Sequence, residues 1–414
     1  MLALIALTLI GVGIALLLQH NVRTTTLLAD SSGRMELVVL SVNSARSSTL
    51  RNAALTSRIV NALPEHTRIL ILAPDREAFS VAANPWPERI GFADMPANYA
   101  LTIWPQDPFL VLQAEDGPRL LASPEFARAE DIEMARVVAA DLGLPLEYAP
   151  LNFEGGNIVS DSEFAFIGAN TIRRNAIDKN QPERAIAEQF RELLGKPVIV
   201  IGPAPQPVGH IDMMLTPLGE HRLMLADPGW GARIAAQAIA DDPAAVTAFE
   251  SSAEINFFGR SDIASVTTLD GEIIHPPPII GTTALAIADS EASATTLDRV
   301  AETLTALGFE IIRVPFLQRL PPPIESIAAG ETITSQPGFP QLTYNNVLIE
   351  TENGRKTVYL PAYGWAALDD AGAEAWRAQG YEVVQIPGFT TSAMYGGALR
   401  CSVKVLRRKL ETAD

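Results

Sequence analysis

The sequence is poor in cysteine and in basic residues, and each shortage disfavours a class of structure or function. Its 414 residues include a single cysteine, Cys401, so no disulfide can form within the chain. Lys and Arg number 31 against 48 Asp and Glu, which gives a formal net charge of −17. Nucleic-acid binding needs basic patches and is therefore disfavoured, whereas a negative cleft suits a cationic small molecule. No P-loop or G-x-G-x-x-G motif opens a predicted helix, so nucleotide binding has no support.

Residues 1–18 lack charged side chains altogether. As a helix they would span about 27 Å, close to the thickness of a bilayer core. No Lys or Arg precedes this stretch and no Ala-x-Ala-like site follows it, so we expect a membrane anchor more than a cleaved signal peptide. The rest of the chain would then lie outside the cytoplasm. The alternative is translation from Met35 and a cytoplasmic protein.

After a linker over residues 19–34, residues 35–414 read as one α/β domain with an insertion at about 242–278. A helix that stops and is followed by a β-rich run recurs five times. The first helix ends at Pro64, which cannot continue it. The other four end at glycines suited to a left-handed helix cap: Gly143, Gly195, Gly308 and Gly380. Five similar units predict a repeat architecture, with an ordinary open α/β sheet as the alternative.

Polar motifs stand at the starts of these units. The sequence Gly209-His210-Ile211-Asp212 opens the fourth and reads as a strand, in which His210 and Asp212 would point to the same face. Taken alone, the pair is better explained by a core histidine that an acid satisfies. Similar motifs place Asp107 after Trp104, Glu154 before Gly-Gly-Asn, and Cys401 after Gly-Gly. Their order along the chain is more informative than any one of them.

That order resembles the guanidine-modifying, or pentein, superfamily, which includes arginine, agmatine and peptidylarginine deiminases and amidinotransferases. The resemblance runs from about Met35 to Leu410 and implies a five-fold pseudosymmetric α/β propeller of ββαβ-type units. Three stretches look most like the catalytic domain of peptidylarginine deiminases: residues 104–107, 208–227 and 397–408. The Glu154-Gly-Gly-Asn sequence is more like the bacterial agmatine deiminases.

The resemblance implies a role for each residue of these motifs. Cys401 would attack the guanidinium carbon as a thiolate, and His210 would pass protons to ammonia and from water. Asp107 and Asp212 would hold the planar cation by charge-assisted hydrogen bonds, and Glu154 would orient His210. Further substrate contacts are expected from Trp104, Asp161, Asn345, Asn346 and Arg400.

Several positions depart from the family pattern. The family usually has His immediately before the cysteine, where this chain has Arg400, a cation that could favour the thiolate or compete with substrate. Gln106 replaces the Arg of agmatine deiminases, as in the calcium-dependent animal enzymes. Those enzymes bind calcium through acidic residues just after the aspartate, but here Pro108, Phe109 and Leu110 follow Asp107. We therefore expect no metal or other cofactor for the chemistry, with calcium left open.

The resemblance implies a hydrolase that converts peptidyl-arginine to peptidyl-citrulline and ammonia through an amidino group bound to the cysteine. The partner would be an arginine-containing protein or peptide. Three alternatives remain: a deiminase of a free guanidine such as agmatine or arginine, an amidinotransferase, and a non-catalytic binding protein of the same fold.

Overall fold

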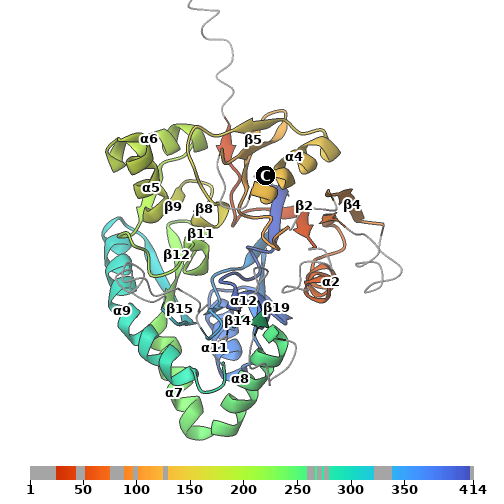
Figure 1. The fold of residues 1–414 in the computed structure, drawn as a ribbon. Helices are drawn as coiled ribbons and strands as arrows, with labels where there is room; N and C mark the ends of the chain where they lie inside the picture. The colour runs from red at the N-terminus through yellow and green to blue at the C-terminus, as the bar shows by residue number, and fades with distance from the viewer. Residues whose placement is uncertain are drawn as a thin grey trace, which may run out of the picture.

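The computed structural model describes residues 25–42, 52–74, 88–96, 101–124, 129–258, 266–267, 273–274, 279–320 and 338–410. The expected membrane anchor, residues 1–18, lies outside them. Within the described residues, no helix is long and apolar enough to cross a membrane. These residues form a mixed α/β fold of small sheets flanked by helices (Figure 1).

Five sheets of three or four strands carry the described fold, and a two-stranded hairpin accompanies them. Each of the five contains an antiparallel pair whose second strand also pairs in parallel with a strand beyond a helix. A parallel pair needs such a crossover connection, and a helix provides it. The five expected strand–strand–helix–strand units are thus confirmed. Closure of the sheets into a five-fold propeller stays a prediction.

The elements fall into these units in chain order. The first sheet is β20-β2-β3-β4, with strands Val403–Lys409, Arg34–Ser41, Arg68–Ala73 and Ile90–Asp94 and helix α2, Ala53–Ala62. The second is β1-β5-β6-β7, with Thr26–Leu27, Phe109–Ala114, Gly117–Ala122 and Leu146–Tyr148 and helix α4, Ala129–Leu142. The third is β10-β9-β8, with Val198–Ile201, Ala165–Gly168 and Ile158–Ser160 and helices α5, Ala169–Lys179, and α6, Glu183–Leu194.

The remaining units carry the longer helices. The fourth sheet is β11-β12-β15-β16, with Leu215–Gly219, Arg222–Asp227, Glu310–Leu317 and Leu342–Thr343 and helices α7, Pro228–Asp241, and α9, Thr283–Ala306. The fifth is β17-β18-β19, with Leu348–Glu352, Arg355–Ala362 and Glu382–Pro387 and helices α11, Ala366–Arg377, and α12, Thr390–Met394. The expected insertion holds helix α8, Pro243–Phe258, and the hairpin β13, Val266–Thr267, with β14, Ile273–Ile274.

The predicted helix ends are confirmed. Gly143, Gly195, Gly308 and Gly380 all have positive φ, between 64° and 92°. Glycine has no Cβ and adopts this conformation without strain, which is why it stops these helices. The α2 helix ends at Ala62, just before Pro64, as the sequence indicates.

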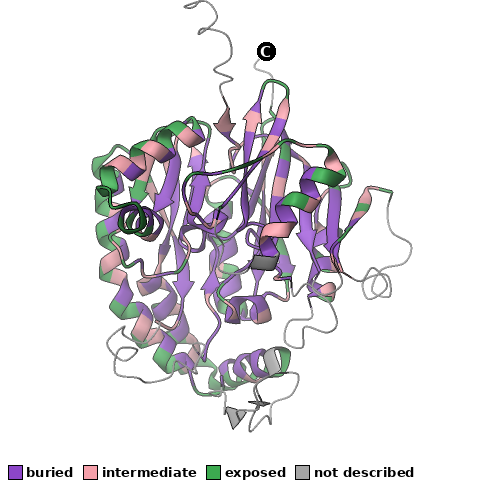
Figure 2. Cartoon of the chain, turned by 45° about the horizontal axis from the view of Figure 1, so that its top comes forward, coloured by how far each residue is buried: buried purple, intermediate pink, exposed green. Residues whose placement is uncertain are grey.

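The two ends of the described chain meet in the fold. The last strand, β20, pairs antiparallel with β2, so the first sheet is built from both ends of the chain. The sequence places residues 19–34 in a linker, but the structure assigns their last part to the domain. Thr26–Leu27 pairs with β5 because its backbone completes the exposed edge of that sheet. Figure 2 shows that the strands are mostly buried and that the helices expose their outer faces.

Candidate active site

The residues expected at the site stand at equivalent places in the five units. Each lies shortly before the first strand of its antiparallel pair: Asp107 before β5, Glu154 before β8, Asp212 before β11, Asn346 before β17 and Cys401 before β20. The fold therefore delivers one polar loop per sheet. Contacts among these loops bring the side chains together.

His210 and Asp212 do not lie on a strand, which corrects the prediction. Residues Ile211–Met213 form a 3-10 turn, η2, which follows His210, and β11 begins only at Leu215. The turn forms because the backbone N–H groups of Met213 and Met214 donate to the carbonyls of His210 and Ile211. The side chain of Asn157 also accepts the N–H of Ile211 at 3.1 Å, which ties the turn to the Glu154-Gly-Gly-Asn motif.

Cys401 is buried, with 2% of its surface exposed, and is fixed on two sides by Asn346. The Asn346 Nδ2 donates to Cys401 Sγ at 3.1 Å, and the backbone N–H of Cys401 donates to Asn346 Oδ1 at 3.1 Å. Burial raises the pKa of the Cys401 thiol well above its usual value, and the charges of Asp212 and Asp107 raise it further. A cation near these carboxylates would favour the thiolate.

Asp212 uses only one of its two oxygens. Its Oδ2 accepts a hydrogen bond from Arg400 Nη1 at 2.9 Å and lies 3.6 Å from Cys401 Sγ. Its Oδ1 is buried and has no hydrogen-bond partner among the described residues. A buried carboxylate oxygen without a donor is costly, so this atom is suited to accept an N–H from a bound molecule.

His210 lies between two carboxylates. Its Nε2 is 2.6 Å from Glu154 Oε2 and its Nδ1 is 3.7 Å from Asp107 Oδ1, while 19% of its side chain stays exposed. Burial alone would lower the pKa of His210, but Asp107 and the hydrogen bond to Glu154 raise it to about 9. The imidazole is therefore protonated at neutral pH and can donate a proton to a leaving group.

Close packing explains the glycines in two of the motifs. A Cβ on Gly156 would lie 2.5 Å from His210 Nδ1, and its backbone N–H donates to Asp107 Oδ1 at 3.1 Å. A Cβ on Gly397 would lie 2.6 Å from the Trp104 ring. Trp104, expected to contact substrate, is buried and packs against the loop that precedes Cys401. Its role as a substrate contact stays a prediction.

Two other expected substrate contacts have structural partners. Asp161 accepts backbone N–H groups of Glu163 at 2.8 Å and Phe164 at 2.7 Å, which closes the turn between β8 and β9. These bonds account for its burial without a ligand. The backbone carbonyl of Asn345 accepts from Thr216 Oγ1 at 2.6 Å, but Asn345 Nδ2 is buried without a partner among the described residues. The two hydrogen bonds between Asn346 and Cys401 show that Asn346 holds the Cys401 side chain and backbone in place.

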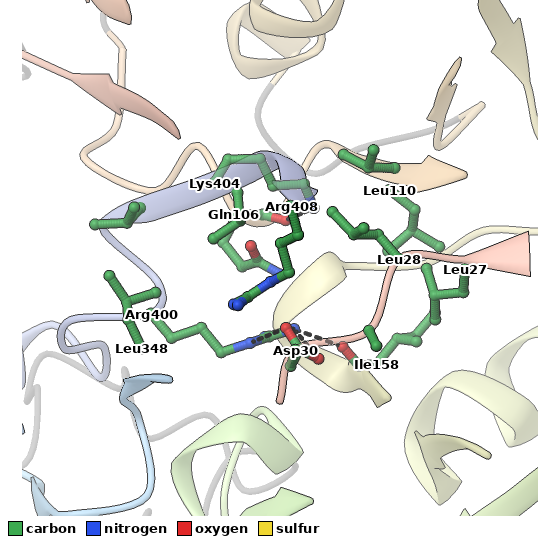
Figure 3. A pocket seen from close by; sticks show the side chains of 14 residues that line it. Leu27, Leu28, Asp30, Gln106, Leu110, Ile158, Leu348, Arg400, Lys404 and Arg408 are labelled. Atoms are coloured by element: carbon green, nitrogen blue, oxygen red, sulfur yellow. Dashed lines mark hydrogen bonds and ion pairs between the residues drawn. The ribbon is translucent and has the colours of Figure 1, made fainter. Parts of the chain in front are cut away.

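Asp30 contacts Arg400 although the two residues lie far apart in the sequence, and the sequence analysis did not predict it. Arg400 donates from Nε and Nη2 to Asp30, at 3.1–3.2 Å, and from Nη2 to the Ile158 carbonyl at 3.0 Å (Figure 3). Burial opposes the charge of Arg400, but Asp30 and Asp212 raise its pKa above the usual value. The one available signal was Arg400 itself, because a cation beside the cysteine needs a paired acid wherever it is buried.

A cavity of about 30 Å³ lies beside this ion pair. Arg400, Lys404 and Arg408 line it together with Asp30 and apolar residues of β5 and the N-terminal segment (Figure 3). Lys404 Nζ donates to the Gln106 carbonyl at 3.2 Å and lies 5.1 Å from the centre of the Phe109 ring. Burial and then the charge of Arg400 lower the pKa of Lys404 to about 7. Within the described residues, no group of three or more His, Cys, Asp or Glu side chains is placed so that it could hold a metal ion.

Comparison with known proteins gives a likeness in structure alone. No family model and no curated protein matches the sequence. Among solved structures, C. jejuni agmatine deiminase has a TM-score of 0.57 at 13% identity, over 94% of this chain and 97% of that one. Agmatine deiminase of Enterococcus faecalis gives 0.60 at 12% identity, over 93% and 96%. A protein provisionally named a peptidyl-arginine deiminase gives a TM-score of 0.59 at 12% identity, over 93% of this chain and 99% of that one.

The chain has the pentein fold. Sequence identity this low extends the likeness to the fold and no further. The similar solved structures are mostly named as deiminases, and agmatine deiminases are prominent among them. They do not favour the peptidyl-arginine reading that the sequence suggested first.

Proposed function

We propose that the protein is a deiminase that hydrolyses the guanidino group of a small free guanidine, such as agmatine or arginine, to a ureido group and ammonia. The observation that carries the proposal is the unpartnered Oδ1 of Asp212, buried beside Cys401 in a cluster of carboxylates. A guanidinium supplies what this cluster lacks, because it is planar, permanently cationic and rich in N–H donors.

Binding and activation are coupled through charge. A guanidinium on Asp212 Oδ1 and Asp107 would neutralise the two carboxylates that raise the pKa of the Cys401 thiol. The thiol then loses its proton more readily, and the thiolate forms where the substrate carbon is held. The N–H of Asn346 at 3.1 Å from Sγ stabilises the same anion.

The proposed reaction has two halves. The Cys401 thiolate forms a C–S bond with the guanidinium carbon, and the C–N bond to one terminal nitrogen breaks as His210 gives that nitrogen its proton. Ammonia leaves, and an amidino group remains on sulfur. Water then attacks the same carbon, His210 takes a proton from it, and the C–S bond breaks to restore the thiolate and release a urea. Glu154, at 2.6 Å from His210, holds the imidazole in place through both halves.

The similar solved structures support a free guanidine as the substrate. Two of them are named agmatine deiminases, and a Cys-to-Ser variant of the C. jejuni enzyme was solved with substrate bound. One observation favours peptidyl-arginine as a second candidate. Gln106 precedes Asp107 where agmatine deiminases have Arg, as in the animal enzymes that the sequence also resembles. Its side-chain Nε2 donates to the Gly155 carbonyl at 3.3 Å.

Substrate profiling tests the proposal. Purified protein is incubated with agmatine, arginine and an arginine peptide, with and without calcium, and ammonia and ureido product are quantified. We expect one ammonia per ureido group and the highest kcat/KM for a free guanidine. A higher kcat/KM for the peptide would select the second candidate. Transfer of the amidino group to an added amine without ammonia release, or no reaction with any guanidine, would contradict deimination.

A further inference from the structure

We propose that Asp30 is a positioning residue that holds Arg400 so that Arg400 occupies only Oδ2 of Asp212 and leaves Oδ1 for the substrate. This inference rests on the proposed function for the identity of that substrate. It assigns part of the active site to the segment before β2, outside the stretch in which the sequence resembles known deiminases.

The geometry of Arg400 divides its donors between two acids. The edge of the guanidinium formed by Nε and Nη2 faces Asp30, at 3.1–3.2 Å (Figure 3). Only Nη1 reaches Asp212, at 2.9 Å. An Arg–carboxylate pair is most stable when two parallel hydrogen bonds form along one such edge. Without Asp30, the free edge could turn to Asp212 and engage both of its oxygens. Arg400 would then compete with a substrate that carries the same cationic group.

Asp30 is itself held rigidly. Its backbone N–H donates to the Ser160 carbonyl at 2.8 Å, and its Oδ2 accepts the Ser160 N–H at 2.8 Å. Ser160 Oγ donates to the Leu28 carbonyl at 2.9 Å, and the Leu28 N–H donates to the Val111 carbonyl at 2.9 Å. The segment is thus fixed to both β8 and β5. Such fixation is needed if one carboxylate is to set the angle of a buried guanidinium.

Charge gives Asp30 a second effect on the site. Arg400 is buried beside Cys401, and its cation offsets the two carboxylates that face the thiol. Asp30 in turn offsets Arg400. Loss of the Asp30 charge should therefore favour the Cys401 thiolate, and loss of the Arg400 charge should oppose it. A segment that only filled space would produce neither change.

The experiment compares four variants of the full chain: Asp30→Asn, Arg400→Gln, the double variant, and Ser160→Ala. Ser160→Ala is the matched control, because it removes a hydrogen bond to the same segment and leaves the Asp30–Arg400 pair intact. Two quantities are measured for each. One is the split between KM and kcat for the best guanidine. The other is the pH dependence of alkylation by iodoacetamide, which reports Cys401 alone because the chain has no other cysteine.

We expect Asp30→Asn to raise KM about tenfold, the equivalent of one charge-assisted hydrogen bond, with a smaller change in kcat. Arg400→Gln in the same chain should return KM toward the wild-type value, because it removes the competing guanidinium. The thiol pKa should fall by about half a unit or more in Asp30→Asn and rise by about one unit in Arg400→Gln. Ser160→Ala should match the wild type within about twofold in KM, since it leaves the charges alone.

Three outcomes would overturn the inference: Asp30→Asn behaving as Ser160→Ala does, a double variant with a higher KM than Asp30→Asn, or thiol pKa values that move in the same direction in both single variants. If Asp30→Asn fails to fold, the single variant Arg400→Gln decides, because a thiol pKa unchanged from wild type in that variant would contradict the charge relation between Arg400 and Cys401 on which the inference rests. If no guanidine is turned over, the proposed function fails, whereas the alkylation profiles still test the charge relation.

Discussion

Cys401 is surrounded by two groups of charged side chains: His210 with Glu154 and Asp107, and Asp212 with Arg400 and Asp30. In the first group, the imidazole is partly exposed and can exchange protons with solvent. In the second, Arg400 and Asp212 are buried, and Arg400 is bound on both sides by acids. The comparison indicates a division of work. Under the proposed function, the first group would move protons, with Asp107 also in contact with the guanidinium, and the second would fix the acceptor oxygen for the substrate.

The largest effect is expected from Cys401→Ser, which removes the atom that both groups serve. A serine hydroxyl is a far weaker nucleophile than a thiolate, so turnover should fall at least about a thousandfold. The thermal unfolding midpoint should stay close to that of the wild type, because oxygen replaces sulfur without emptying the site. Ammonia release and a thermal melt check both statements. Substantial residual turnover would remove Cys401 from the mechanism.

Asp212→Asn and Asp107→Asn each change one of the two groups, and we expect them to differ in the free energy of unfolding. Each should lower kcat/KM at least about a hundredfold, because a guanidinium loses one of its two carboxylates. Asp212→Asn should also lower the free energy of unfolding by about 1–3 kcal/mol, since it weakens the buried hydrogen bond to Arg400. Asp107→Asn should cost less, and chemical denaturation measures the difference. Equal stability losses would contradict the proposed division.

Glu154→Gln tests the proton-moving group through pH. Asp107 and Glu154 overcome burial and raise the pKa of His210 to about 9, so kcat/KM should fall as pH rises through about 9 and the imidazole loses its proton. In the variant, the pH at which kcat/KM falls should be lower by about one pH unit, because His210 loses one of the acids that raise its pKa. Stability follows the same sign: the charged His210 contributes fully below its ordinary pKa of 6.5, and the contribution is lost as pH rises through about 9. If kcat/KM of the variant falls at the same pH as in the wild type, a group other than His210 causes the fall.

The same two groups differ in how far sequence could predict them. The five units, their glycine helix ends and the motif residues from Asp107 to Cys401 are local patterns, and the structure brings His210 together with Glu154 and Asp107. The 3-10 turn at residues 211–213 was missed because backbone hydrogen bonds and the Asn157 side chain fix it. Asp30 was missed because its contact with Arg400 joins residues 370 positions apart. No local pattern marks such a pair.

The smallest effect is expected from Lys404→Met beside the second group. Burial and Arg400 lower the pKa of Lys404 to about 7, below its ordinary 10.5, so the folded protein binds fewer protons than the unfolded chain between these values. Lys404 therefore destabilises the fold more at pH 7 than at pH 10. The variant's gain in thermal midpoint over wild type should be larger at pH 7 and shrink toward pH 10. Its kcat/KM should change less than about threefold, since Lys404 contacts neither Cys401 nor Asp212 through a described hydrogen bond.

The most direct test of the account is a crystal structure of the Cys401→Ser variant with the best guanidine bound. We predict that the guanidinium carbon faces the serine hydroxyl, that one N–H of the substrate donates to Asp212 Oδ1, and that Arg400 still contacts only Oδ2 and Asp30. A guanidinium bound away from this cluster, with Asp212 Oδ1 still lacking a donor, would contradict the central claim that these carboxylates hold the substrate in front of Cys401.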